Sequence, residues 1–439
     1  MKHRPEEAVD TSRAYRRSAL LLLTLVYIFN FVDRQVLNIL AEAIKHDLAL
    51  SDTQLGIVTG LAFALFYSLL GVPIARFAER ADRPRLIAIA LSVWSLFTLL
   101  CGAAGSFTQM LICRLGVGIG EAGGVPPSHS LIAEFSPKAR RAVALAIFST
   151  GLPLGSFIGL GFGGILGDAL GWRWTFAVAG APGLLIAVVV MLVLKEPRRT
   201  FPLLTSAAPA EPLRASLASF LSTSTYRWTV AGGALQAVVL YGTGAFLAPF
   251  FLRAHGPELA ALAAGLGLKA NGFLGLAFGV TVGLAGAVGT FLGGWLGDRF
   301  HGASLKSYVT VPALAGWLSI PAFLVVFCAH DLATAFLALG FANAMINAYF
   351  GPMHATCQGV AGASRRATVS AVTLVIVNLV GLGLGPPLVG MISDHARNAM
   401  AMESKDALRL ALVAISAVSL PAGLAFWRAR ASIDADTVS

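Results

Sequence analysis

Apolar runs of about twenty residues recur along almost the whole chain, and each is long enough to cross a lipid bilayer as a helix. Of the 439 residues, 56% are hydrophobic and 12% are charged. The charged share is about half that of an ordinary soluble domain. A chain with so little polar surface cannot cover its apolar residues in water. The sequence therefore predicts an all-α integral membrane protein.

Charged residues and Gly or Pro breaks divide these runs into twelve predicted transmembrane helices. The first six are expected at residues 18–43, 52–79, 85–105, 107–134, 141–168 and 172–194. The second six are expected at residues 226–254, 271–298, 306–330, 332–360, 365–394 and 406–428. A polar, proline-rich stretch separates the two groups. The expected domains are an N-terminal tail (1–17), a six-helix bundle (18–196), a linker (197–225), a second six-helix bundle (226–430) and a C-terminal tail (431–439).

Basic residues are distributed unequally between alternate connections. With the N-terminus in the cytoplasm, 23 of the 32 Lys and Arg residues fall on the cytoplasmic side and 7 on the opposite side. The positive-inside rule therefore predicts that both termini and the linker are cytoplasmic. This orientation also explains the net charge of +10 without a nucleic-acid partner. The absence of any Asn-x-Ser/Thr acceptor favours a bacterial inner membrane.

Motifs for a leader peptide, a metal or a cofactor are missing or out of context. The first apolar run lacks a small-residue cleavage site, which indicates a retained span. The four cysteines lie in apolar segments without CxxC spacing. The dinucleotide-like pattern from Gly118 to Gly123 falls inside a predicted span and follows no strand, and the chain contains no P-loop. We expect no metal, no cofactor and no ATP-driven pump.

Short motifs recur at matching positions of the two halves. Gly294-Trp-Leu-Gly-Asp298-Arg299 follows the eighth span, and Ala75-Arg-Phe-Ala-Glu79-Arg80 follows the second. The fifth and eleventh spans are both rich in Gly and Pro. Six spans, a linker and six similar spans indicate an internally duplicated transporter, in which the substrate site is expected near the bilayer midplane between the halves.

At these residues the sequence resembles the major facilitator superfamily over essentially the whole chain. The resemblance implies the major facilitator fold and a cytoplasmic gating motif, Gly-x-x-x-Asp-Arg followed by basic residues. The second-half copy matches this motif, whereas the first-half copy departs from it, with Ala75 for Gly and Glu79 for Asp. The gating residues implied are Glu79, Arg80, Arg83, Arg85, Asp298 and Arg299.

A narrower resemblance, to the spinster family of lipid transporters, rests on three segments. They are Asn30-Phe-Val-Asp33-Arg34-Gln-Val-Leu-Asn38, Gly71-Val-Pro-Ile-Ala-Arg76 and Arg114-Leu-Gly-Val-Gly-Ile-Gly-Glu121-Ala-Gly-Gly-Val-Pro-Pro127. The resemblance implies export of sphingosine phosphate or a lysophospholipid. It also implies proton coupling at Asp33 and Glu121 and head-group binding or gating at Arg34 and Arg114.

The same four residues are notable without any family, because each places a charge deep in an apolar segment, where it costs several kcal/mol unless paired or hydrated. Arg114 and Glu121 are seven residues apart and share a helix face about 10 Å apart, with Gly118 between them leaving room for a substrate or a neighbouring helix. Asp33 and Arg34 are consecutive and point about 100° apart, so only one of them can face a cavity squarely.

The four charges sum to zero, and protonating either carboxylate leaves the cluster net positive. We therefore hypothesise that a proton on Asp33 or Glu121 releases an arginine, which then binds an anionic head group. Arginine suits phosphate because its planar fork donates two parallel hydrogen bonds. Two purely structural ion pairs, or a uniporter that ignores pH, would carry the same four residues, and the sequence does not select the coupled carboxylate.

Polar and aromatic residues of other spans are candidates for the rest of the substrate site, although packing is a common role for each. This proposed set contains Asn30, Tyr241, Phe246, Asn343 and Asn347. The alternative function is proton-coupled transport of a soluble organic anion or drug. A lipid hydrolase would need a nucleophile and base beyond the adjacent Ser128 and His129, and a lipid receptor would bind without transport. We expect a monomer that contacts its substrate, protons and membrane lipids.

Overall fold

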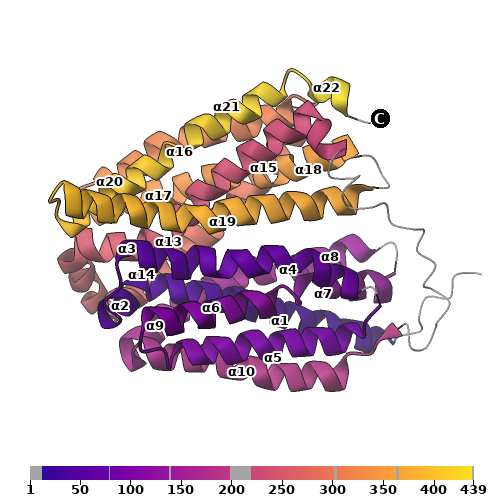
Figure 1. Ribbon diagram of the computed structural model, residues 1–439, viewed down its shortest axis with the longest axis horizontal. Helices are drawn as coiled ribbons and strands as arrows, with labels where there is room; N and C mark the ends of the chain where they lie inside the picture. Colours follow the sequence, from indigo (N-terminus) through magenta and orange to yellow (C-terminus); the bar gives the residue numbers. More distant parts are fainter. Residues whose placement is uncertain are drawn as a thin grey trace, which may run out of the picture.

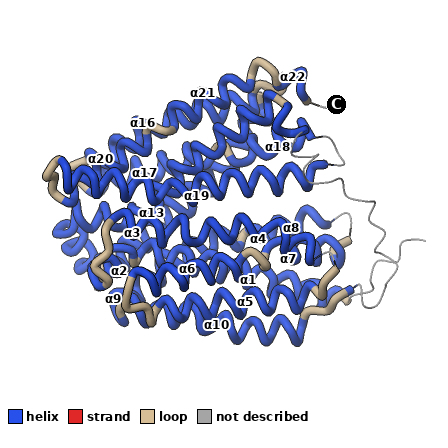
Figure 2. Tube along the Cα trace, viewed as in Figure 1, coloured by secondary structure: helices blue, strands red, loops and turns tan. Residues whose placement is uncertain are grey.

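In a computed structural model of the chain, every regular element of the described residues is a helix (Figures 1 and 2). The structure describes residues 12–78, 80–137, 140–197, 219–300, 304–361 and 365–437. Most of the predicted linker, together with Glu79 of the predicted gating motif, lies outside these residues. The first half contains α1 (Arg13–Ile39), α2 (Ala41–Asp47), α3 (Asp52–Gly56), the π-helix η1 (Ile57–Leu61), α4 (Ala62–Ala78), α5 (Arg83–Cys101), α6 (Phe107–Glu121), α7 (Val125–Phe135), α8 (Arg141–Ser149), α9 (Gly151–Leu170) and α10 (Trp172–Val193).

The second half repeats this arrangement. It contains α13 (Ser224–Gly265), α14 (Ala270–Phe278), the π-helix η4 (Gly279–Leu284), α15 (Ala285–Arg299), α16 (Ser307–Cys328), α17 (Leu332–Asn347), α18 (Phe350–Ala361), α19 (Arg366–Ala399), α20 (Ser404–Ser416), α21 (Ser419–Ala429) and α22 (Ile433–Asp436). The long helices of each half form one bundle, and the two bundles lie side by side (Figure 1).

Eleven helices of the described residues are long and apolar enough to cross a membrane. The remaining predicted span, the fourth, is broken at Ala122–Gly124 into α6 and α7, neither of which reaches membrane length alone. Large apolar side chains also cover the outside of the bundles: Leu192 is 80% exposed and Leu337 is 78% exposed. Such a surface is stable in lipid and not in water. The fold is therefore that of a twelve-span membrane protein.

Several helix ends differ from the expected boundaries; α5, for example, ends at Cys101 and not at residue 105, and α19 ends at Ala399 and not at residue 394. α1 begins at Arg13 and not at residue 18, because Ser12 accepts a hydrogen bond from the Tyr15 N–H and caps the helix. The element α13 runs to Gly265, but His255 (φ −126°, ψ 20°) is non-helical and joins two helices across a kink. The first of these helices therefore ends next to the predicted boundary at residue 254.

We call the end of the molecule that carries Ser12 and Thr437 the termini end, and the opposite end, which carries α2 and the start of α3, the distal end. The continuous helix formed by α3, η1 and α4 packs against α19, and α9 packs against α14 and η4. These two seams join the halves. A Cβ added at Gly56 would lie 2.3 Å from the Pro386 carbonyl oxygen, and one at Gly275 would lie 2.1 Å from that of Leu160. Glycine therefore lets the helix backbones touch.

Replacing Gly275 with alanine is expected to lower the melting temperature in detergent, because the added methyl group overpacks the seam by about 1–3 kcal/mol. The control is Gly283→Ala in the adjoining π-helix η4, where an added Cβ meets nothing within 4 Å. Both changes raise helix propensity equally, so the difference between the two melting temperatures isolates the contact. Equal melting temperatures would show that the seam tolerates a side chain.

Candidate functional site

A break in the fourth span positions Glu121. This residue ends α6, and the next helix starts at Val125 after three residues in turns. Interrupted membrane helices are typical of transporter binding sites, because the break frees backbone groups beside a cavity. Glu121 is completely buried and faces α1.

Glu121 forms an ion pair with Arg34 of α1. The Arg34 Nε and Nη2 atoms donate to the same carboxylate oxygen, Oε2, at 2.8 and 2.5 Å. The Arg34 side chain is 17% exposed, whereas the Glu121 side chain is fully buried. Arg34 is thus the member of the pair that can meet a solute. The sequence predicted that both residues belong to one charged cluster, but it did not predict that they pair with each other.

Aromatic rings surround the two arginines. The Arg34 guanidinium carbon lies 4.3 Å from the ring centroid of Phe63, 4.9 Å from Tyr67 and 5.1 Å from Phe31. The Arg114 guanidinium carbon lies 5.6 Å from the same Phe63 ring. Each such cation–π contact stabilises a desolvated guanidinium by up to about 2 kcal/mol. Phe63 therefore stands between the two positive charges.

Arg114 is supported by the backbone of η1. Its Nε donates to the Val58 carbonyl at 3.3 Å, while its Nη1 is buried without a hydrogen-bond partner among the described residues. Gly118, one turn further along α6, lies against Phe63, where an added Cβ would be 2.6 Å from the carbonyl oxygen. The sequence predicted that the space at Gly118 admits either a substrate or a neighbouring helix. The structure shows a neighbouring helix there.

Asp33 points away from the Arg34–Glu121 pair, as expected for consecutive helical residues. Its Oδ2 accepts a hydrogen bond of 3.0 Å from the Thr98 hydroxyl of α5, and the side chain is buried. Thr98 carries no sequence signal of its own. The cluster is therefore divided into an Arg34–Glu121 pair and an Asp33–Thr98 pair, both inside the first half.

Several buried atoms of the cluster have no hydrogen-bond partner among the described residues. They are both amide atoms of Asn30, Asp33 Oδ1, Arg114 Nη1 and Glu121 Oε1. Asn30 also lines a small cavity with room for about one water molecule. Unpaired buried polar atoms are rare and call for a cause. Here they leave capacity to bind a proton, water or a polar ligand.

The second-half candidates for the substrate site have different surroundings in the structure. The hydroxyl of Tyr241 donates to Asn378 Oδ1 at 3.3 Å, and Tyr241 lies within electrostatic range of Arg34. Asn343 and Asn347 instead donate to carbonyls of their own helix, at Leu339 and Asn343. Phe246 is fully buried in the apolar core. Tyr241 is thus the member of this set whose side chain bonds to a residue of another helix, Asn378 of α19.

The predicted gating residues of the first half contact their own half. Arg83 is fully buried, pairs with Glu134 at 2.5 Å and with Glu196, and donates to the Ser130 hydroxyl at 2.9 Å. The backbone N–H of Arg85 donates to the Asp82 side chain at 3.0 Å, and this hydrogen bond caps the start of α5. Arg80 is exposed.

In the second half, Asp298 accepts a 2.7 Å hydrogen bond from Tyr308, and Arg299 is exposed at the end of α15. Arg83 and Asp298 thus each contact residues of their own half at the termini end.

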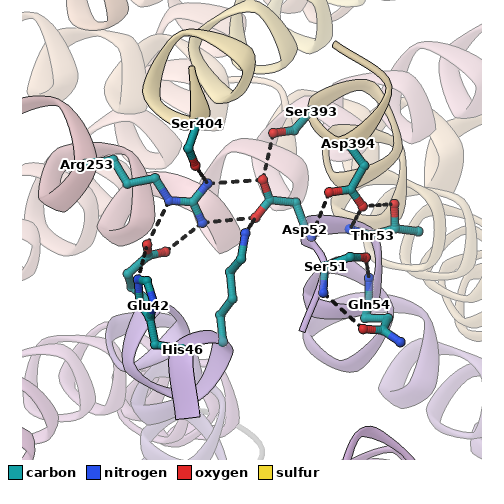
Figure 3. Close-up of polar contacts among 11 residues, drawn as sticks. Glu42, His46, Ser51, Asp52, Thr53, Gln54, Arg253, Ser393, Asp394 and Ser404 are labelled. Carbon is teal, nitrogen blue, oxygen red and sulfur yellow. Dashed lines mark hydrogen bonds and ion pairs between the residues drawn. The ribbon is translucent and has the colours of Figure 1, made fainter. Parts of the chain in front are cut away.

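A network of charged residues joins the two halves at the distal end (Figure 3). Arg253 of α13 donates to Glu42 at 2.8 and 2.7 Å, and to Asp52 at 3.1 and 2.9 Å. Asp52 also pairs with Lys45 and accepts a 2.7 Å hydrogen bond from Ser393 of α19. Asp52 is completely buried. The network thus joins α2 and α3 of the first half to α13 and α19 of the second half.

The sequence does not link Lys45, Asp52 and Arg253, because Arg253 lies far along the chain from the other two, and all three lie at the ends of predicted spans or in the connections between them. One signal was present: Lys45 and Arg253 are basic residues on the side where the positive-inside rule expects few. A basic residue in such a position is a candidate for an ion pair.

The fold and this arrangement of charged residues define a class of membrane protein. Residues 23–386 match the family model of the Major Facilitator Superfamily, and the chain belongs to this family of transporters. Over 442 residues it is 32% identical to an MFS-type efflux pump of Mycolicibacterium smegmatis, a match that covers 99% of this chain and 98% of the relative. It is 26% identical to protein spinster homolog 1 of Xenopus laevis, covering 90% of this chain and 76% of the relative.

A solved structure resembles the whole chain. It is that of a bacterial homolog to the human lysosomal transporter spinster in an inward-facing, unoccupied conformation. The TM-score is 0.86 at 30% sequence identity, and the match covers 98% of this chain and 100% of the other. The protein is therefore an integral, multi-pass Major Facilitator Superfamily transporter that resembles spinster.

Proposed function

We propose that the protein is a proton-coupled secondary transporter that moves an amphipathic anionic lipid, of the sphingosine phosphate or lysophospholipid type, by alternating access. The observation that carries the proposal is the Arg34–Glu121 pair. A partly exposed arginine is held by a fully buried carboxylate that still has one unpaired oxygen.

Protonation of Glu121 removes the negative charge that holds Arg34. The cluster then changes from neutral to net positive, and Arg34 is free to donate two parallel hydrogen bonds to a phosphate. Tyr241 of the second half is our candidate for contacting the head group from the opposite side. Arg114 adds a second positive charge behind Phe63. Asp33, which accepts a hydrogen bond from Thr98, is the alternative site for the coupled proton.

The orientation follows from the distribution of basic residues, with both termini cytoplasmic in a bacterial inner membrane. The distal end is then the outer side, and its inter-half network is a closed outer gate. This state suits substrate exchange with the cytoplasm. We also propose that the two six-helix bundles have the predicted boundaries, with a linker at residues 197–225, and that the protein is a monomer.

The second candidate function is proton-coupled efflux of a soluble organic anion or drug. The name of the Mycolicibacterium smegmatis relative, an efflux pump, favours it. The same four charges would serve such a substrate, because an organic carboxylate or phosphate binds arginine in the same way.

The deciding experiment is flux of labelled sphingosine phosphate, lysophospholipid and a soluble organic anion in proteoliposomes, with and without a pH gradient. We expect gradient-stimulated lipid flux that Arg114→Ala removes and Arg114→Lys partly restores, because lysine keeps the charge without the planar fork. Flux of the soluble anion alone would favour the second candidate. Lipid flux that survives Arg114→Ala would contradict the proposed role of Arg114.

A further inference from the structure

A short motif, Gly-x-x-x-Asp, occurs at the distal ends of α9 and α19, as Gly164 to Asp168 and Gly390 to Asp394. These helices occupy matching positions in the two halves, since each is the fifth span of its half. In both copies the glycine and the aspartate meet the first residues of a helix that belongs to the other half. The two copies can therefore be compared contact by contact.

In the second-half copy, Asp394 caps the start of α3. Its carboxylate accepts hydrogen bonds from the N–H groups of Asp52 (3.0 Å) and Thr53 (2.8 Å) and from the Thr53 hydroxyl (2.6 Å) (Figure 3). α3 continues without a break through η1 into α4. The carboxylate thus lies at the positive end of a complete membrane-spanning helix.

In the first-half copy, Asp168 caps the start of α14 in the same way. Its carboxylate accepts from the Gly272 N–H at 2.7 Å and from the Asn271 side-chain amide at 2.8 Å. Lys269 donates to the Asp168 carbonyl at 2.9 Å. α14 continues through η4 into α15, so this carboxylate also lies at the start of a long helix.

The glycines make both contacts possible. A Cβ at Gly390 would lie 2.2 Å from the Asp52 carbonyl oxygen, and a Cβ at Gly164 would lie 2.1 Å from that of Asn271. In each copy the glycine brings the two backbones together, and the aspartate, one helical turn later on the same face, reaches the free N–H groups.

We propose that these two copies form a pair of equivalent latches that set the stability of the closed distal end. Each latch places one carboxylate of one half on a helix N-terminus of the other half. Because they lie in separate seams, opening the distal end must break both, which exposes two carboxylates and two sets of N–H donors. The inference rests on the proposed alternating-access cycle, but not on the substrate or the proton.

The test is a spin-label distance measurement across the distal end. Labels at Thr108 and Met400, exposed residues of opposite halves near that end, are introduced into the full-length protein with its four native cysteines replaced. Asp168→Asn and Asp394→Asn keep the side-chain size and remove the charge. Each is expected to raise the population ratio of open to closed distal ends by about threefold. The double variant should raise it by about tenfold, because separate sites act independently.

The control is Asp331→Asn. Asp331 also lies at the distal end and accepts a 2.8 Å hydrogen bond from the Thr334 N–H, but it caps a helix of its own half. This variant should leave the distance distribution unchanged. The proposal is overturned if the double variant matches the wild type, or if Asp331→Asn opens the distal end as far as the double variant does. Neither outcome bears on lipid flux, so the latches and the proposed function fail separately.

Discussion

Glu121→Gln should abolish accumulation driven by a pH gradient while leaving substrate exchange across the membrane in place. Glutamine keeps the size of the side chain and one oxygen that accepts a hydrogen bond from Arg34, but it carries no exchangeable charge. The cluster is then permanently net positive, as in the proposed protonated state. A substrate can still bind and cross, yet no proton crosses with it. Uptake under a gradient and counterflow at equal pH, measured on one preparation, separate the two processes.

The control is Glu121→Asp, which keeps a titratable carboxyl group and should keep part of the gradient-driven accumulation. Glu121→Gln should also melt at a lower temperature, since removing one charge of a buried pair costs about 3–5 kcal/mol. Full gradient-driven accumulation by Glu121→Gln would remove Glu121 from the coupling mechanism and leave Asp33 as the remaining candidate.

Arg253→Met is expected to open the distal end and to slow transport. The change preserves the apolar stem of the side chain and removes the guanidinium that joins Glu42 to Asp52. Truncating one member of a desolvated charge pair at an interface costs about 2–5 kcal/mol, or at least roughly thirtyfold in an equilibrium constant. Spin-label distances between Thr108 and Met400 should lengthen, and flux should fall because the distal end closes less often.

A matched control is available at the same end of the molecule. Arg173 pairs with Asp47, but both residues belong to the first half and both are partly exposed. Arg173→Met should therefore leave the distance distribution and the flux near those of the wild type, as expected for an exposed ion pair. If the two variants shift the distances equally, the network across the seam has no special role in closure.

The helical fold follows from local features of the sequence. Membrane spans depend on the length of each apolar run, which the sequence displays directly, and the repeated motifs indicate two similar halves. The fourth span shows what local features do not predict. Its break at Ala122–Gly124 is rich in glycine and contains no polar residue, so the sequence there does not indicate an interruption of the helix. The seventh span shows the opposite case, because its first helix ends at the kink at His255, next to the predicted end at residue 254.

The charged cluster was predictable as a set but not as a set of pairs. The seven-residue spacing places Arg114 and Glu121 on one helix face, yet Glu121 bonds to Arg34 and Arg114 bonds to the Val58 carbonyl. Which groups meet depends on how α1, α4 and α6 cross, and spacing within one helix carries no information about that. The distal network is subject to the same limit, since Asp52 and Asp394 are 342 residues apart.

The π-helix η1 has a consequence for register. A π turn accommodates one residue more than an α-helical turn, and η1 lies between Gly56, which touches α19, and Phe63 and Tyr67, which surround Arg34. Deleting one residue within 57–61 would leave a regular α-helix whose two ends still face the same neighbours, because the π turn absorbs the extra residue. In a helix without the π turn the same extra residue would rotate everything after it by about 100° and take both rings away from the arginine. Sequence comparisons or grafts that cross this helix must therefore count residues separately on each side of η1.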